Sequence, residues 1–276
     1  MCRLLAWAGR EPVTVVEALG EDELEAFTAL SRQHADGWGM AWWPPEEPGE
    51  LPAPQIERST TCAAEDPRYR EVTHAARGNA GFVHLRWATP GLAVATVNTH
   101  PFTHGRLAFA HNGAIHPQQR LDEILPAQWR SQMTGTTDSE RYFLAIVAAL
   151  DAGASVHHAV ASVVHDVFAR FEPTSLNAML LAPDALYIIA AYDPAKVPAV
   201  GASARGGAPT AELDTVFYDL HHRSSADSFV VASSGFQQHG GAPWESLGNM
   251  TLLRVQRGTL ATTVSSLETS TVPLGS

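Results

Sequence analysis

The stretch that decides the fold is MCRLLAWAG, residues 1–9, in which Cys2 and Arg3 precede a short apolar run that begins at Leu4. A short apolar run of this kind, closed by Gly9, is typical of a buried β-strand. The pattern therefore places Cys2 at the entrance of a strand inside the molecule. We also expect Met1 to be removed, because the small side chain at position 2 permits it, and Cys2 then becomes the first residue.

An N-terminal cysteine can supply a nucleophile and a base together. A thiol reacts as its thiolate, and a pKa of about 8.5 leaves little thiolate at neutral pH. The free α-amine of the same residue has a pKa of about 7.7–8.0 and can relay a proton, as in N-terminal threonine hydrolases. The alternative is a chance cysteine beside the initiating methionine, so the position of Cys2 does not establish a nucleophile by itself.

Strand-length apolar runs lie on both sides of a helical block. Apolar residues at helical spacing predict helices over residues 21–33, 139–150 and 156–168. Continuous apolar or aromatic runs predict strands over residues 37–43, 81–88, 106–113, 176–182, 185–192, 215–220, 228–233 and 250–255. Stretches rich in proline and glycine predict surface loops at 44–54 and 196–209.

This order of elements, with strands before and after two helices, indicates layered sheets with helices outside. The strands are apolar throughout, as expected where both faces of a sheet are covered. No segment requires a boundary, so we expect a single domain over residues 1–276.

Composition excludes several classes of protein. The net charge of −11 disfavours binding to nucleic acids and to anionic membranes. No apolar run approaches the roughly 18 residues of a membrane helix, and the N-terminus is too short in its apolar part for a signal peptide. Two cysteines do not form a disulfide framework. A cytoplasmic, reducing location is therefore expected.

Three polar segments follow predicted strands or open a predicted helix. They are Arg86-Trp87-Ala88-Thr89, His111-Asn112-Gly113 and Thr136-Thr137-Asp138-Ser139-Glu140. With the Met-Cys-Arg start, they resemble in order the class II glutamine amidotransferases, a family of N-terminal-nucleophile hydrolases. The likeness extends to about residue 150, after which only the strand pattern agrees. It implies an α+β fold, a four-layer αββα sandwich of two mainly antiparallel sheets flanked by helices.

The resemblance assigns catalytic roles to Cys2, Asn112 and Gly113. Attack of the thiolate on an amide creates an oxyanion, which needs preorganised hydrogen-bond donors. The family places the side-chain amide of Asn112 and the backbone N–H of Gly113 there, and glycine lets the backbone approach closely. The alternative for Asn112-Gly113 is a hairpin turn, for which Asn-Gly is the leading signal.

Substrate-binding roles follow from the same resemblance. Arg86 matches the arginine that binds the α-carboxylate of glutamine, for which a guanidinium is well shaped. Asp138 matches the acid that receives the substrate ammonium, and Thr89 would help to orient the carboxylate. Trp87 and His111 complete this set. The alternative for Arg86 is a surface ion pair. In the segment of residues 136–140, Thr137 or Asp138 is expected to cap a helix, which is compatible with a carboxylate that faces the pocket.

Three further segments were compared with the family. Pro90-Gly91 stands where sugar-phosphate-type members have His-Gly, and proline removes a backbone donor. His100, within Asn98-Thr99-His100-Pro101, matches a later segment and is either structural or part of the pocket wall. The glycines of Asp36-Gly37-Trp38-Gly39 are expected to pack closely on Cys2, or else to form a turn into a strand.

The implied reaction is hydrolysis of a γ-glutamyl amide through a Cys2 thioester, without metal or organic cofactor. Three functions remain open. The first, which the Arg-Trp-Ala-Thr segment favours, is a glutaminase that passes ammonia from glutamine to a separate synthase partner. The second is a stand-alone hydrolase of a biosynthetic intermediate, such as the γ-glutamyl hercynylcysteine sulfoxide conjugate of the ergothioneine pathway. The third is an inactive binding protein, which the presence of Cys2, Arg86 and Asp138 disfavours.

Overall fold

The computed structural model describes residues 2–45, 52–89, 91–197, 217–236, 238 and 242–268 of the chain. Met1, Pro90 and most of the predicted loops at 44–54 and 196–209 lie outside the described residues.

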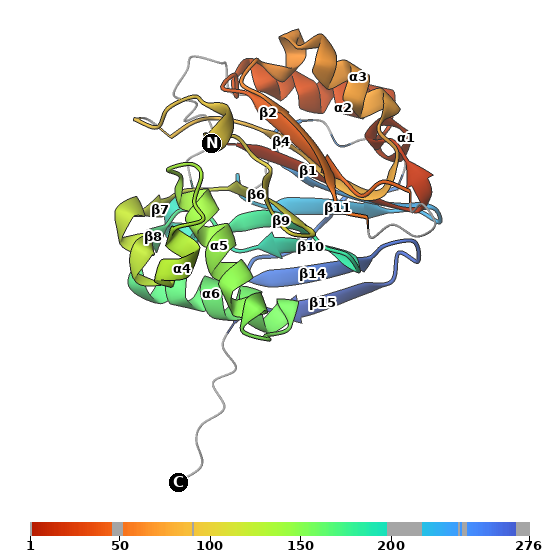
Figure 1. Ribbon diagram of the computed structural model, residues 1–276. Helices are drawn as coiled ribbons and strands as arrows, with labels where there is room; N and C mark the ends of the chain where they lie inside the picture. The colour runs from red at the N-terminus through yellow and green to blue at the C-terminus, as the bar shows by residue number, and fades with distance from the viewer. Residues whose placement is uncertain are drawn as a thin grey trace.

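Two antiparallel sheets lie face to face (Figure 1). The first contains, in spatial order, β13 (Glu245–Ser246), β11 (Leu220–Ser224), β12 (Ser228–Ser233), β1 (Arg3–Val13), β4 (Gly78–Leu85), β2 (Trp38–Trp42) and β3 (Gln55–Ser59). The second contains β15 (Thr262–Ser266), β14 (Thr251–Gln256), β10 (Ala185–Ala190), β9 (Asn177–Leu181), β6 (Leu107–Asn112) and β5 (Phe102–His104). A short ladder joins β7 (Ile115–His116) to β8 (Glu172–Pro173).

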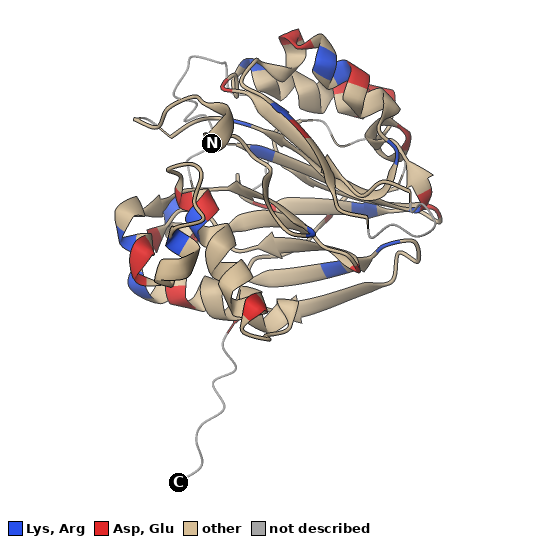
Figure 2. Cartoon of the chain, in the orientation of Figure 1, with Lys and Arg blue, Asp and Glu red and all other residues tan. Residues whose placement is uncertain are grey.

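Helices cover both outer faces of this sandwich (Figure 1). The seven-stranded sheet is covered by α1 (Val15–Leu19), α2 (Glu21–Ala29) and α3 (Pro67–Ala75), and the six-stranded sheet by α4 (Ala127–Arg130), α5 (Asp138–Asp151) and α6 (Val156–Arg170). Short 3₁₀ turns are η1 (Leu30–Arg32), η2 (Ala63–Glu65), η3 (Thr96–Asn98), η4 (Gln118–Glu123) and η5 (Pro194–Lys196). The four layers confirm the predicted αββα sandwich. Figure 2 shows charged residues of both signs on the helices of both faces. Across the described ranges, no helix combines the length and apolarity needed to cross a bilayer.

The burial of β1 explains the apolar run that predicted it. Side chains alternate between the faces of a strand. Leu4 and Ala6 belong to the core between the sheets, while Leu5 and Trp7 belong to the core beneath the helices. Both faces of β1 are therefore covered, and no polar alternation is left in the sequence.

Three predicted strand boundaries are wrong. The strand expected at 81–88 is β4, which covers residues 78–85 and ends before Arg86. β1 does not stop at Gly9 but continues to Val13, with an irregular register after Ala8, because exposed residues can continue a ladder without an apolar signal. Of the strand expected at 215–220, residues 215 and 216 lie outside the described residues, residues 217 and 218 form a turn, and β11 begins at Leu220. The remaining predicted helices and strands overlap elements of the structure.

Candidate active site

Cys2 lies at the end of β1, in the middle of the seven-stranded sheet. The pairing of Arg3 with Leu85 brings the end of β4 beside it. The thiol is buried, its Sγ accepts a hydrogen bond from the Trp87 N–H at 3.3 Å, and it lies 3.5 Å from the Trp87 carbonyl oxygen. Burial raises the pKa of the Cys2 thiol, while the Trp87 N–H and the Arg86 guanidinium act in the opposite direction.

Arg86 is 3% exposed, so it is not part of a surface ion pair. Its guanidinium donates to the carbonyl oxygens of Asp36 at 3.3 Å and of Ala93 at 3.2 Å. Burial lowers the pKa of Arg86, and the proximity of Cys2 and Asp36 opposes that shift. The carboxylate of Asp36 also accepts the Ala88 N–H at 2.9 Å. Main-chain contacts thus hold the guanidinium beside the thiol.

Asn112 and Gly113 do not form a hairpin turn. Asn112 is the last residue of β6, which pairs with β9, and the chain then enters β7. The side chain of Asn112 is 1% exposed, and neither atom of its amide has a hydrogen-bond partner among the described residues. A Cβ atom at Gly113 would overlap the Ser175 carbonyl group. The amide is therefore free to act as a donor, and position 113 has no room for a side chain.

Asp138 is the first residue of α5 and is not its N-cap. The cap is Thr137, whose hydroxyl accepts the Glu140 N–H at 3.1 Å. The Asp138 carboxylate accepts the N–H groups of Ile115 at 2.8 Å and Ser139 at 2.9 Å. It is 5% exposed, so these bonds fix a buried carboxylate at the start of the helix.

His111 is held from both sides of its ring. Nδ1 lies 2.9 Å from the Ser139 hydroxyl and Nε2 lies 2.9 Å from the Ser175 carbonyl oxygen. Burial lowers the pKa of His111, and the nearby Asp138 carboxylate opposes the shift. Two further buried histidine rings, those of His84 and His100, have their centroids 4.1 Å apart. Burial lowers the pKa of His84 to about 3, and burial likewise lowers the pKa of His100.

A single pocket brings these residues together. Of the eight predicted site residues, all but Asn112 line it, and His100 is part of its wall. Lining residues without a role predicted from the sequence are Ala88, Leu92, Asn98 and Ser139, while Thr137, expected as a possible helix cap, also lines the pocket. The volume is about 30 Å³, space for only about one or two water molecules.

The glycines of residues 36–39 do not pack on Cys2, contrary to expectation. A Cβ atom at Gly39 would overlap the carbonyl group of His100. Gly37, with φ of 120°, packs against the backbone of Ser59. Gly37 also contacts the site directly, because its carbonyl oxygen accepts the Arg86 N–H at 2.8 Å. Residues 36–37 lead into β2, as the alternative expected.

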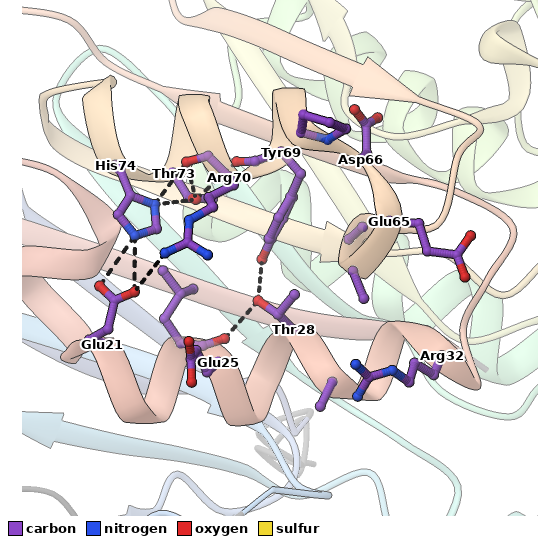
Figure 3. Close-up of a pocket in the computed structure, with 15 residues that line it drawn as sticks. Glu21, Glu25, Thr28, Arg32, Glu65, Asp66, Tyr69, Arg70, Thr73 and His74 are labelled. Atoms are coloured by element: carbon purple, nitrogen blue, oxygen red, sulfur yellow. Dashed lines mark hydrogen bonds and ion pairs between the residues drawn. The ribbon is translucent and has the colours of Figure 1, made fainter.

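A larger cavity, of about 650 Å³, lies between α2 and α3 and contains none of the predicted residues. Its side chains contact one another across the gap (Figure 3). His74 Nε2 lies 3.2 Å from a Glu21 carboxylate oxygen, and the Thr28 hydroxyl donates to the Tyr69 oxygen at 3.2 Å. The smaller pocket is the candidate active site, because Cys2 and six other predicted site residues line it. Within the described ranges, no three His, Cys, Asp or Glu side chains are placed to hold a metal ion.

A thiol at the end of a central strand, between two antiparallel sheets covered by helices, defines an N-terminal-nucleophile hydrolase fold. The sequence profile of the glutamine amidotransferases class-II matches residues 1–273, and the chain belongs to this family.

Two solved structures share the fold. A class-II glutamine aminotransferase domain protein from Silicibacter pomeroyi superposes with a TM-score of 0.61 at 18% identity, covering 96% of this chain and 99% of the other. Glutamine phosphoribosylpyrophosphate amidotransferase from B. subtilis gives a TM-score of 0.63 at 15% identity, covering 98% of this chain and 50% of the other.

Two relatives are similar in sequence over 55% of this chain. A probable glutamine amidotransferase of Saccharomyces cerevisiae is 26% identical over 165 residues, and an uncharacterized protein of Methanocaldococcus jannaschii is 30% identical over 157 residues. The matched regions are 46% and 39% of these relatives, so the chain aligns with less than half of either.

Proposed function

We propose that this protein hydrolyses the γ-amide of glutamine, with Cys2 as the nucleophile. The observation that carries the proposal is the convergence of Cys2, Arg86, Gly113 and Asp138 on one buried pocket. A cation and an anion beside a thiol match the α-carboxylate, the α-ammonium and the γ-amide of a γ-glutamyl group. Trp87, Thr89 and His111 line the same pocket and complete the proposed binding set.

The proposed reaction has two halves. The Cys2 thiolate attacks the γ-carbonyl carbon, and the Asn112 amide with the Gly113 N–H stabilises the oxyanion. The C–N bond breaks as the α-amine of Cys2 delivers a proton to the leaving nitrogen, which departs as ammonia. Water then hydrolyses the γ-glutamyl thioester to glutamate and the free thiol. The proposal requires removal of Met1, since only a free Cys2 amine can act as this base.

We further propose that residues 1–276 form one catalytic domain that works in the cytoplasm and passes ammonia to a separate synthase. In support of one domain, Leu4 from β1 and Val255 from β14 share the core between the sheets. Cys2 and Cys62 are both free thiols, as a reducing compartment favours.

A γ-glutamyl amide of a larger amine is the second candidate substrate. The half-buried Leu92 lines the pocket, and Val94 and Val97, which follow on the same segment, are 49% and 45% exposed. Such apolar side chains favour a leaving amine with an apolar part. Comparison of kcat/KM for glutamine and for γ-glutamyl amides of increasing size separates the two substrates, and a strong preference for bulky amides excludes the glutaminase.

The variant Cys2→Ala tests the nucleophile. We expect it to release no glutamate and to retain the thermal stability of the wild type, because alanine fits the space of the thiol. Cys62→Ala is the matched control: the Cys62 thiol contacts Ser31 rather than the pocket, and its removal leaves turnover unchanged. Normal turnover by Cys2→Ala would falsify the mechanism. Mass spectrometry of active protein should show loss of Met1, and active protein that retains Met1 excludes the α-amine as base.

A further inference from the structure

The side chain of Asn98 lies between the two segments that bind opposite ends of the proposed substrate. Asn98 is the last residue of η3, is 4% exposed and lines the Cys2 pocket. A buried amide has to satisfy both its donor and its acceptor, because an unpaired buried polar group costs roughly 1–3 kcal/mol. The partners that Asn98 uses therefore show what it holds together.

The side-chain amide of Asn98 connects the Ala93 carbonyl group, which binds Arg86, to the segment that precedes Asp138. Its Nδ2 donates to the Ala93 carbonyl oxygen at 3.3 Å, and the same oxygen accepts the Arg86 guanidinium at 3.2 Å. On the other side, its Oδ1 accepts the Thr136 N–H at 2.9 Å. One side chain thus links the carbonyl that holds Arg86 to a residue two positions before Asp138.

Tight packing around Gly135 supports this bridge. A Cβ atom at Gly135 would lie 2.5 Å from Asn98 Oδ1 and 2.6 Å from the Val97 carbonyl oxygen. From the other side, the buried Glu140 carboxylate accepts the N–H groups of Gly135 at 2.8 Å and Thr134 at 2.7 Å. The turn at residues 134–136 is therefore held between Asn98 and Glu140, with no space to shift.

We propose that Asn98 is a positioning residue that fixes Arg86 relative to Asp138, and so couples recognition of the α-carboxylate to recognition of the α-ammonium. This inference rests on the proposed function, in which these two residues bind the ends of a γ-glutamyl substrate. When Arg86 and Asp138 are held at a fixed separation, binding of the α-carboxylate by Arg86 also brings the α-ammonium to Asp138, and the reverse is true. Without the bridge, each group still finds its partner, but the two contacts no longer support one another.

Two truncated amides measure this coupling. Glutaric acid monoamide lacks the α-ammonium group of glutamine, and 4-aminobutanamide lacks its α-carboxylate. The advantage of glutamine over each amide, as a ratio of kcat/KM values, reports how much each group contributes. A variant that only lowers the fraction of folded enzyme reduces all three values equally and leaves both ratios unchanged.

Two substitutions of Asn98 have different expected outcomes. Asn98→Ala removes both bonds, so we expect KM for glutamine to rise roughly ten-fold, and both ratios to fall by a similar factor, with little change in kcat. Asn98→Asp keeps an acceptor for the Thr136 N–H but loses the donor to the Ala93 carbonyl. It therefore breaks the bridge at one bond, and both ratios should fall by the same factor, to a smaller extent than in Asn98→Ala. Asn79→Ala is the control, because it removes an amide bonded to Arg257 at the opposite end of β4 and should change neither ratio.

The measurements separate this inference from the proposed function. If the wild-type protein releases no glutamate from glutamine, the proposed function is wrong and the role of Asn98 is wrong with it. If the wild-type protein is active and both Asn98 variants keep the wild-type ratios, only the coupling is overturned. If Asn98→Ala does not fold, Asn98→Asp decides: an equal fall of both ratios supports the coupling, and a fall of only one ratio overturns it.

Discussion

At the scale of single residues, Asn112 combines complete burial with an amide that has no partner in the described part of the chain. Leaving such an amide unpaired costs folding free energy, on the order of 1–3 kcal/mol for each orphaned group. The charge that develops on a substrate during attack by Cys2 would satisfy the donor. In the proposed mechanism, the unpaired amide lowers the stability of the free protein and stabilises the transition state.

Replacement of Asn112 by alanine should lower kcat for glutamine by about 100- to 1000-fold, the usual loss when one oxyanion donor is removed. KM should change little, because the donor acts mainly on the developing oxyanion. Steady-state kinetics provide the measurement, and alkylation of Cys2 by iodoacetamide provides the control, since it forms no oxyanion and should proceed at the wild-type rate. A fall in alkylation equal to the fall in kcat would show that the substitution disturbs the thiol instead.

The sequence reveals the residues of the site that occur in recognisable segments. Cys2, Arg86, Gly113 and Asp138 were predicted in this way and line one pocket. Asp36 and Ser139 were not assigned roles, although Asp36 accepts the Ala88 N–H and Ser139 contacts His111. Their partners lie 52 and 28 residues away along the chain. Hydrogen bonds across such separations depend on the tertiary fold and leave no local pattern.

At the scale of elements, the start of α5 determines where the Asp138 carboxylate lies. Thr137 caps the helix and lines the pocket, whereas the exposed Ser155 caps the neighbouring helix α6 with a bond to the His158 N–H at 3.3 Å. The two caps have the same hydrogen-bond pattern, but only Thr137 lines the Cys2 pocket.

Thr137→Ala and Ser155→Ala should each lower the free energy of unfolding by about 1 kcal/mol, because each removes a helix cap. Only Thr137→Ala should also raise KM for glutamine, since fraying at the first turn of α5 displaces Asp138. Urea denaturation and steady-state kinetics measure the two effects. An equal change of KM in both variants would mean that α5 does not position the carboxylate.

Elements with a strong apolar pattern were predictable and elements held by a few contacts were not. The helix expected at 156–168 is α6, and the strand expected at 228–233 is β12. α3 was missed because its sequence is mostly polar, with only Tyr69, Val72 and Thr73 buried. β15 was missed because its residues are mostly exposed at the edge of a sheet.

At the scale of the whole molecule, buried neutral histidines make stability depend on pH. His84 is fully buried beside Arg86, His100 and His111, and its pKa falls to about 3. The ordinary value in an unfolded chain is about 6.5. Below pH 6.5, His84 therefore binds a proton in the unfolded chain but not in the folded chain. As a result, the free energy of unfolding decreases as the pH falls toward 3.

We expect His84 to contribute a slope of up to about 1.4 kcal/mol per pH unit in this window. His84→Gln should remove about one proton from the pH dependence of the unfolding free energy between pH 6 and pH 4.5. Chemical denaturation at several pH values measures the slope. The exposed His157 serves as control, and His157→Gln should leave the slope as in the wild type. An unchanged slope in His84→Gln would assign the acid sensitivity to other groups.

The pairing of β1 has a consequence for the time course of synthesis. One neighbour of β1 is β4, and the other is β12, whose last residue is Ser233. A ribosome adds roughly 5–20 residues per second, so the first strand waits many seconds for its last neighbour. Throughout that interval the strand that carries the thiol lacks a complete sheet, and its leading residues remain within reach of a processing peptidase. If Met1 is removed as proposed, the interval before β12 emerges is a period in which that removal can take place.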